Sequence, residues 1–346
     1  MRFSRLGTVQ RRLRLRGAAV MSLLFACFLL ANAVAYIHAY RMTHYITAGT
    51  RTPRPESLSL RQKVRVLVTG PVLPKARNMK TPRELGLDYR AMIVTASDNT
   101  RLATWWVPSP CPRGTVILFP GYSSCRSSLL PQSRFLHDLG WNVLLVDFRG
   151  CGDSDGTVTT LGVEEAKDVA AASRLAIDGS SEKPLVLYGT SMGGAAVLRA
   201  VADGLVEPEG LILECPFDRL VTTVGHRFTA VGLPAFPFAR MLVFWGGIQH
   251  GFDGFAHNPV DYARSVRSPA LVLQGRKDRR VTVAEARAVC DGMNGRGTFH
   301  LFQGAAHGGF CESAPSEYRS VVTAWLGALT TRGSRKEDSP PTEPPG

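Results

Sequence analysis

The chain has 346 residues, of which 45% are hydrophobic and 20% are charged, a composition typical of a globular protein and not of a disordered or fibrous one. The chain has 41 Lys and Arg residues and 28 Asp and Glu residues, a net charge of +13. Nine of the positive charges precede Glu56, the first acidic residue. The remaining body therefore carries only about +4, which argues against a surface for nucleic-acid phosphates.

Residues 18–40 contain no Lys, Arg, Asp or Glu. As an α-helix, this segment would extend roughly 35 Å, enough to cross a bilayer. Six arginines precede it and three follow within about fifteen residues. The positive-inside rule therefore predicts a single-pass signal-anchor helix, with the basic segment 1–17 in the cytoplasm and the rest on the extracytoplasmic side. The alternative is a signal peptide cleaved near Ala33-Val34-Ala35, which would export the domain.

Residues 41–87 are basic and are interrupted by prolines, so we expect a connector without long regular elements. From residue 88 onward, strand and helix patterns alternate. The predicted strands are 89–97, 101–108, 114–120, 141–147, 184–189, 210–214, 269–275 and 298–302, the first two forming a hairpin. The predicted helices are 129–139, 163–177, 192–202, about 283–290 and 316–329.

This alternation predicts an α/β fold with βαβ units and a mainly parallel sheet, to which the hairpin adds antiparallel strands at one edge. The domain extends over residues 88–329, and the polar, Pro-rich tail 330–346 is expected to be disordered. The six cysteines of the body show no metal-ligand spacing, and disulfides and free thiols remain equally open.

A G-x-S-x-G pattern, Gly189-Thr190-Ser191-Met192-Gly193, directly follows a predicted strand and opens a predicted helix. A turn this sharp strains the backbone of its central residue and needs small neighbours, which Gly189 and Gly193 provide. Ser191 is therefore predicted to be an exposed nucleophile at the carboxyl edge of the sheet. The alternative interpretation is a glycine-rich helix entry with a capping serine.

A serine nucleophile needs a base and a carboxylate that orients the base. Of eight histidines, His307 follows the last predicted strand in a loop of small residues, and Asp278 follows the strand 269–275. We therefore predict the triad Ser191, Asp278 and His307, with Asp218 as the second candidate for the acid. If each is considered alone, Asp278 could instead be a solvent-exposed loop aspartate and His307 a histidine packed within its loop.

Two backbone N–H groups must stabilise the oxyanion that forms during attack. Met192 follows the nucleophile at a helix N-terminus, so its amide is the first expected donor. The second is expected from the loop Pro120-Gly121-Tyr122 after the strand 114–120, with the Tyr122 amide as the candidate.

With these motifs, residues 88–329 resemble the α/β-hydrolase superfamily, and within it the membrane-anchored abhydrolases and the serine-aminopeptidase-like branch. The run Asp147-Phe148-Arg149-Gly150-Cys151-Gly152-Asp153-Ser154 is similar to the structural D-x-R-G-x-G-x-S turn of that family. The resemblance implies an eight-stranded, mainly parallel sheet with helices on both faces. Pro120 stands where the family commonly has His.

In such a fold, the insertion 219–257 would be a short lid. It contains seven Phe and Trp residues, and its roles as an apolar pocket, a packed core element or a membrane contact remain open.

The sequence thus predicts a membrane-anchored serine hydrolase that cleaves a carboxylic ester or thioester through an acyl-enzyme. A serine peptidase or an acyltransferase on the same fold is the first alternative, and an inactive hydrolase-like binding module is the second. We expect a small-molecule or lipid-like acyl substrate, no metal or organic cofactor and no nucleic-acid partner.

Overall fold

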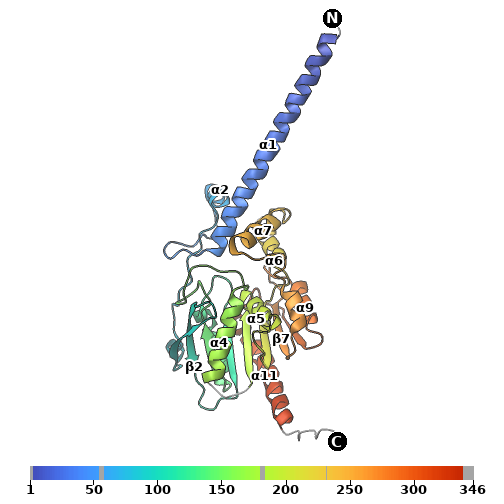
Figure 1. Ribbon diagram of the computed structural model, residues 1–346. Helices are drawn as coiled ribbons and strands as arrows, with labels where there is room; N and C mark the ends of the chain where they lie inside the picture. Colours follow the sequence, from blue (N-terminus) through green and yellow to red (C-terminus); the bar gives the residue numbers. More distant parts are fainter. Residues whose placement is uncertain (1–2, 54–57, 180–183, 231, 338–346) are drawn as a thin grey trace.

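In the computed structural model, which describes residues 3–53, 58–179, 184–230 and 232–337, one sheet is built in the order β1-β2-β4-β3-β5-β6-β7-β8 (Figure 1). The strands are β1 (Arg90–Thr95), β2 (Arg101–Val107), β3 (Thr115–Phe119), β4 (Asn142–Val146), β5 (Leu185–Thr190), β6 (Gly210–Glu214), β7 (Ala270–Gly275) and β8 (Gly297–Phe302). β2 pairs antiparallel with β1 and β4, and every other pairing is parallel. The predicted fold class is confirmed.

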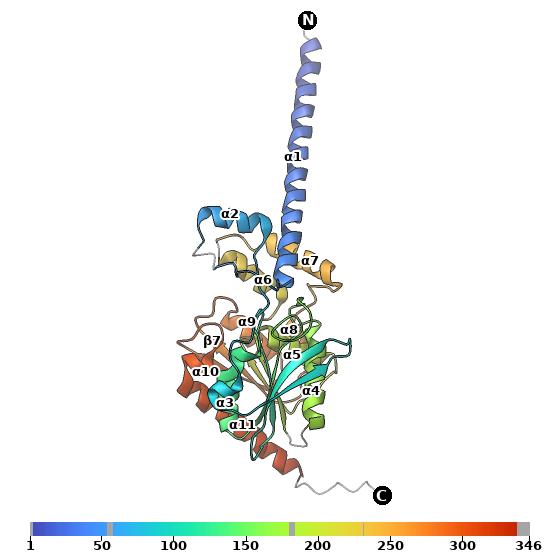
Figure 2. The same cartoon turned by 90° about the vertical axis from the view of Figure 1, so that its left-hand side faces the viewer.

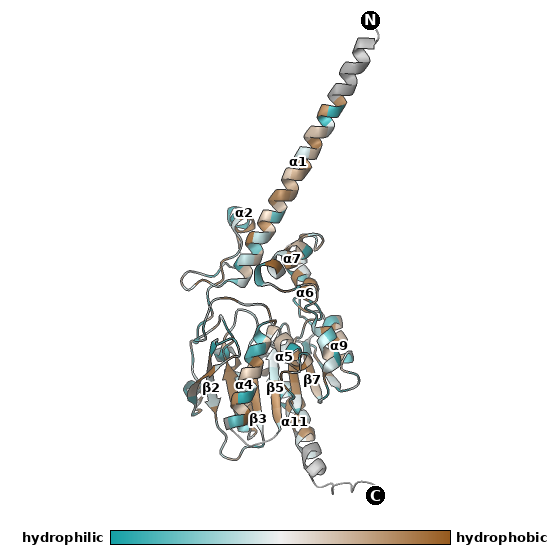
Figure 3. Ribbon diagram, in the orientation of Figure 1, coloured by the Kyte–Doolittle hydropathy of each residue, from teal (hydrophilic) through white to brown (hydrophobic). Residues whose placement is uncertain are grey.

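The central strands are apolar on both faces because helices cover both faces. On β3, Ile117 and Phe119 pack in one core with α4 and α5, whereas Val116 and Leu118 pack in a second core with α3 and α11. Figure 2 shows these helix pairs on opposite sides of the sheet, and Figure 3 shows the apolar strands between them. The covering helices are α3 (Leu130–Asp138), α4 (Glu165–Gly179), α5 (Met192–Ala202), α9 (Val283–Asp291) and α11 (Pro315–Glu337).

The N-terminal helix α1 runs from Phe3 to Thr43 and projects far beyond the body (Figure 1). It is therefore longer than the predicted segment 18–40, and the predicted basic segment 1–17 is helical from Phe3 onward. The part Leu13–Thr43 is long and apolar enough to span a membrane. The apolar pattern predicted a helix in this region correctly, but it does not define where a continuous helix begins and ends.

The connector contains a helix that the sequence analysis missed, α2 (Leu60–Thr69). Ser59 caps it by accepting from the Gln62 amide, and the Gln62 side chain accepts from the Ser59 amide, so a capping box starts the helix. The prolines of the connector all lie outside α2, so their frequency did not exclude a regular helix between them.

The insertion forms two helices, α6 (Leu220–Thr229) and α7 (Phe238–His250), which lie between α1 and the carboxyl edge of the sheet (Figure 2). Helix α7 packs on α1, where Trp245 Nε1 donates to Asn32 Oδ1 at 3.1 Å and Gln249 Nε2 donates to the Tyr36 carbonyl at 2.9 Å. Shorter helices are α8 (Pro259–Tyr262) and α10 (Phe310–Ser313).

The last helix continues to Glu337, so the expectation of a disordered tail from residue 330 is wrong for residues 330–337. The rest of that prediction, residues 338–346, lies outside the described residues. All seven cysteines are free thiols, five of them buried, and this decides between the two alternatives left open above.

The D-x-R-G-x-G-x-S turn is a structural element around the buried carboxylate of Asp147. This carboxylate accepts hydrogen bonds from the amides of Arg126 and Asp153 and from Asn78 Nδ2, and it pairs with the Arg126 guanidinium at 3.1 Å. Gly152 has a φ of +51°, and a Cβ at this position would lie 1.8 Å from Asp147 Oδ2.

Gly152→Ala is therefore expected to lower the free energy of unfolding by about 2–4 kcal/mol, because the methyl group displaces a fully paired carboxylate. Gly204→Ala is the matched control, since Gly204 has a φ of +68° but open space at its Cβ position. The control is expected to cost about 1 kcal/mol, for the backbone alone. Equal losses for the two variants, measured by chemical denaturation in detergent micelles, would contradict this interpretation.

Candidate active site

The turn between β5 and α5 holds Ser191 in a strained conformation, with φ +52° and ψ −110°. Close contacts explain the two glycines that flank it. A Cβ at Gly189 would lie 2.5 Å from the Gly194 amide nitrogen, and one at Gly193 would lie 2.4 Å from the Phe119 carbonyl oxygen. Strain of this kind persists only where the surrounding structure enforces it. The G-x-S-x-G segment therefore has the geometry of a nucleophile elbow.

The elbow is fixed to its neighbours through the backbone. The Ser191 amide donates to the Glu214 carbonyl at 2.7 Å. Its side chain lies beside the loop after β3, because a Cβ at Gly121 would lie 3.7 Å from Ser191 Cβ. In the described residues the Ser191 hydroxyl has no hydrogen-bond partner, and Ser191 lines a pocket. The hydroxyl is thus available to a bound molecule.

His307 and Asp278 meet at the carboxyl ends of β7 and β8. Nδ1 of His307 is 2.6 Å from Asp278 Oδ2, and the exposed fractions of the two side chains are 15% and 0%. Burial raises the pKa of the Asp278 carboxyl, but the hydrogen bond and charge of His307 and the amides of Arg280 and Val281 outweigh it, so the pKa is lowered. The carboxylate therefore stays ionised and fixes which imidazole nitrogen carries the proton.

The loop of His307 lies against the elbow. A Cβ at Gly308 would lie 3.7 Å from the Thr190 side chain and 3.6 Å from Glu214 Oε1. The structure thus places His307, which is adjacent to Gly308, next to the turn that carries Ser191. Ser191 and the His307–Asp278 pair thus lie at the same edge of the sheet, with no hydrogen bond between Ser191 and His307 among the described residues.

Glu214 is a buried residue beside the elbow whose contacts the sequence analysis did not predict. Its buried carboxylate accepts from the Tyr188 hydroxyl at 2.5 Å and from the Phe310 amide at 3.2 Å, and its own carbonyl holds the Ser191 amide. One side chain therefore connects the strand of the elbow to the loop of His307. A buried acidic residue at the end of an apolar strand, GLILE, was the available signal.

The second candidate acid, Asp218, lies elsewhere. It accepts from the Arg219 amide, and burial together with the negative charge of Glu285 raises its pKa. In the described residues, Asp218 makes no contact with His307. The geometry favours Asp278 as the partner of the imidazole.

His257 is the fully buried histidine of this region, and both of its ring nitrogens are engaged. Nδ1 is 3.1 Å from the Tyr262 hydroxyl, and Nε2 is 3.1 Å from the Leu161 carbonyl. Burial lowers the pKa of His257 to about 4, although the Leu161 carbonyl opposes this shift. His257 is therefore a structural residue and does not compete with His307 as a base.

His257 is expected to make stability depend on pH. The unfolded chain takes up a proton at this imidazole as the pH falls through about 6.5, whereas the folded chain does so only near pH 4. The folded state should thus lose up to about 3 kcal/mol of stability between these values. His257→Gln is expected to show a smaller loss over the same interval in denaturation curves. Parallel curves for the two proteins would refute the assignment.

Tyr122 and Met192, the two residues with the predicted oxyanion donors, line the same pocket as Ser191. In the described part of the chain, neither backbone amide donates to another protein group. The Met192 amide is at the N-terminus of α5, where the helix dipole favours negative charge. Both amides are thus available to an anion beside Ser191.

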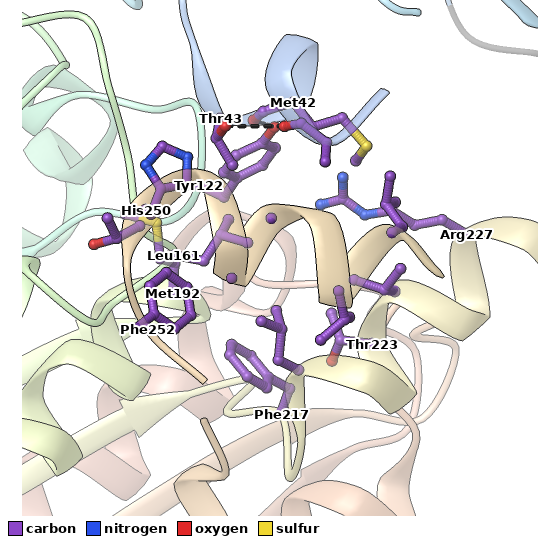
Figure 4. Close-up of a pocket in the computed structure, with 18 of the residues that line it drawn as sticks. Met42, Thr43, Tyr122, Leu161, Met192, Phe217, Thr223, Arg227, His250 and Phe252 are labelled. Carbon is purple, nitrogen blue, oxygen red and sulfur yellow. Dashed lines mark hydrogen bonds between the residues drawn. The ribbon is translucent and has the colours of Figure 1, made fainter. Parts of the chain in front are cut away.

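The pocket is mostly apolar and is lined by six parts of the chain, some of whose residues are shown in Figure 4. Met42 and Thr43 lie on one side of it and Phe217 on the opposite side. Arg227 of α6 also lines it, with its guanidinium 4.9 Å from the centre of the Tyr122 ring. No acidic residue is found among the described residues that line this pocket.

A metal could in principle be held by Cys215, Asp278 and His307, whose ligand atoms lie within 4.8 Å of one another. These atoms already have partners, because Asp278 and His307 bond to each other and Cys215 Sγ accepts from the Gly308 amide. Burial also raises the pKa of the Cys215 thiol well above its ordinary value, which opposes the thiolate that a metal needs. The donor set does not fit a resident metal.

A family model described as serine aminopeptidase, S33, matches residues 110–243. Protein bem46 of Schizosaccharomyces pombe is 26% identical over 241 residues, which are 68% of this chain and 76% of that protein. An uncharacterised membrane protein of Saccharomyces cerevisiae is 31% identical over 156 residues, 44% of this chain and 55% of that protein. A solved esterase of Pyrococcus furiosus superposes with a TM-score of 0.63 at 26% identity, covering 74% of this chain and 97% of the esterase.

Proposed function

We propose that this chain, which belongs to the α/β-hydrolase superfamily, is a membrane-anchored serine hydrolase that cleaves a carboxylic ester or thioester. The observation that carries the proposal is the 2.6 Å contact between His307 and Asp278, in a loop that lies beside the strained elbow of Ser191. The ionised, buried carboxylate of Asp278 orients the imidazole of His307, and the hydroxyl of Ser191, on the neighbouring turn, has no hydrogen-bond partner among the described residues. Nucleophilic acyl transfer requires these three groups.

The reaction would begin with attack of Ser191 Oγ on the acyl carbonyl carbon. Nε2 of His307 takes the hydroxyl proton, while Asp278 holds the imidazole through Nδ1 and stabilises its positive charge. The amides of Tyr122 and Met192 donate to the developing oxyanion. The alcohol or thiol leaves with the proton from His307, and a water deprotonated by His307 then releases the acid from the acyl-enzyme.

The anchor in this proposal is α1. By the positive-inside rule, the arginines before residue 18 support a cytoplasmic N-terminus, which would put the catalytic body on the extracytoplasmic side. The yeast relative described as a membrane protein supports the anchoring. Export after cleavage near Ala35 is the alternative, and it would remove Asn32, the partner of Trp245, while the Gln249 bond to Tyr36 would remain.

Peptide hydrolysis is the second candidate function, because the matching family model is described as a serine aminopeptidase. An aminopeptidase must recognise a positively charged amino group, for which a carboxylate is the natural partner. The described lining of the pocket has Arg227 and no acidic residue, which favours esters.

The full chain in detergent is expected to hydrolyse p-nitrophenyl butanoate and a butanoyl thioester with kcat/KM of about 10⁴ M⁻¹ s⁻¹ or more. Amino-acid p-nitroanilides are expected to be much poorer substrates, because the pocket offers no partner for the α-amino group. The measurement is the release of nitrophenol, thiol and nitroaniline under identical conditions. Hydrolysis of the anilides alone would overturn the ester assignment in favour of a peptidase.

A further inference from the structure

We propose that the pocket beside Ser191 binds the acyl chain of a bilayer lipid ester, and that the last turns of the membrane helix α1 form one wall of this pocket. The proposal rests on the proposed function and names its substrate class. Helix α1 would then be a component of the binding site in addition to being the anchor.

The contacts at the end of α1 are the first argument. Ala39, Met42 and Thr43 line the same pocket as Ser191, and Ala39 is buried. The Tyr122 hydroxyl donates to the Met42 carbonyl, so the loop that carries a proposed oxyanion donor is bonded to the membrane helix. Figure 4 shows Tyr122 directly beneath Met42 and Thr43.

The end of α1 is held rigidly against the catalytic body. The Thr159 amide donates to the Thr43 carbonyl at 2.9 Å, and the Tyr45 amide donates to the Thr157 carbonyl at 2.7 Å. From the other side, α7 holds α1 through the hydrogen bonds of Trp245 and Gln249 described above. The wall that α1 contributes is therefore as fixed as the walls contributed by the sheet and the lid.

The level of the bilayer is the second argument. The charge-free segment ends at Tyr40, so the pocket residue Ala39 lies within one helical turn of Arg41, the first charged residue after the membrane span. Trp245, which bonds Asn32 of α1 about two turns further into the span than Ala39, belongs to a residue type enriched at membrane interfaces. The pocket thus lies at the boundary between the bilayer and water.

Exposed apolar side chains at the same level support this placement. Helix α2 exposes the apolar side chains of Leu60, Val64, Leu67 and Val68 at helical spacing. Its charged residues are all basic: Arg61, Lys63 and Arg65. A basic helix with an apolar face is typical of segments that lie in the membrane interface. The lid adds the exposed side chains of Phe236, Phe244 and Ile248. Figure 1 shows α2 and α7 on either side of the base of α1.

The lining of the pocket is the third argument. Phe217, Leu220, Val224, Leu242 and Val243 supply apolar walls between α1 and Ser191. An acyl chain gains free energy from each methylene buried there, whereas a short polar ester leaves most of this surface unused. The apolar lining therefore favours the acyl group of a membrane-held ester over a polar substrate.

The pocket can be shortened at Gly246, a lining residue of α7 at which a Cβ would meet no atom within 4 Å. Gly246→Leu is expected to lower the ratio of kcat/KM for a hexadecanoyl ester to that for a butanoyl ester about tenfold or more, since methylene-sized changes in such pockets have effects of this size. Gly327→Leu is the matched control, because Gly327 of α11 also has open space at its Cβ position and lies outside the pocket. The control should keep the wild-type ratio.

The contribution of α1 itself is tested at Met42. Met42→Ala lengthens the pocket on the membrane side, so the preferred acyl chain is expected to become longer by at least two carbons in a graded series of esters. All variants are assayed as full chains in proteoliposomes, and fluorophosphonate labelling of each one reports an intact nucleophile independently of chain length.

The possible failures can be told apart. A labelled protein whose chain-length ratio is unchanged by both Gly246→Leu and Met42→Ala would overturn the acyl-pocket proposal and leave the proposed hydrolase standing. An equal loss for short and long esters would also overturn it, since the side chain would then obstruct the serine itself. A folded wild type without labelling or ester hydrolysis would instead refute the proposed function.

Discussion

Ser191→Ala is expected to lower kcat for ester hydrolysis by about 10⁶, the loss typical of removing the nucleophile of a serine hydrolase. The strained turn places residue 191 at the proposed nucleophile position, and an alanine there has no hydroxyl to attack with. KM should change little, since the walls of the pocket are untouched. The measurement is steady-state hydrolysis of p-nitrophenyl butanoate by the full chain in detergent.

Ser128→Ala is the control for this variant, because the Ser128 hydroxyl donates to the Cys125 carbonyl and lies outside the described lining of the pocket. Its kcat should match the wild type. Turnover by a folded Ser191→Ala protein within tenfold of the wild type would exclude Ser191 as the nucleophile.

Asp278→Asn is expected to lower kcat by about 10⁴, because an amide at this position favours the wrong imidazole tautomer. The Asp278 carboxylate accepts from the amides of Arg280 and Val281 at 2.7 and 3.1 Å, and the asparagine oxygen can keep both bonds. The loop should therefore fold normally, and the loss should appear in kcat at every pH at which the wild type is active.

Asp218→Asn is the matched comparison, since Asp218 was the other acid that the sequence allowed. Its carboxyl lies with Arg219 and Glu285, so we expect kcat within about threefold of the wild type, as for a substitution away from the reacting groups. A large loss for Asp218→Asn and a small one for Asp278→Asn would reverse the assignment.

The sheet could be predicted from the sequence because its strands are apolar on both faces and are separated by helices of regular length. The segment GTVILFP shows the strength of this signal, since its five central residues are all buried in β3. The elbow was predictable for a different reason. Only small residues fit beside Ser191, so its steric demands appear directly in the sequence as Gly189 and Gly193.

The features that were missed depend on contacts between distant residues. Nothing in the sequence around Ala39 or Met42 indicates that the end of the anchor meets the elbow some 150 residues later. The bridging role of Glu214 likewise depends on Tyr188 and Phe310, which lie in other elements. Helix α2 was missed because none of its residues is buried in the core. Its local sequence pattern therefore gave no sign of what its apolar side chains contact.

The most direct test of the account is to label the detergent-solubilised full chain with a fluorophosphonate probe and to map the adduct by mass spectrometry. The account predicts a single phosphonylated peptide with the modification on Ser191, and no labelling of Ser191→Ala. It also predicts much slower labelling of Asp278→Asn, because the imidazole would no longer activate the hydroxyl. A folded wild type that remains unlabelled, or an adduct on another residue, would contradict the central claim that Ser191 is the activated nucleophile.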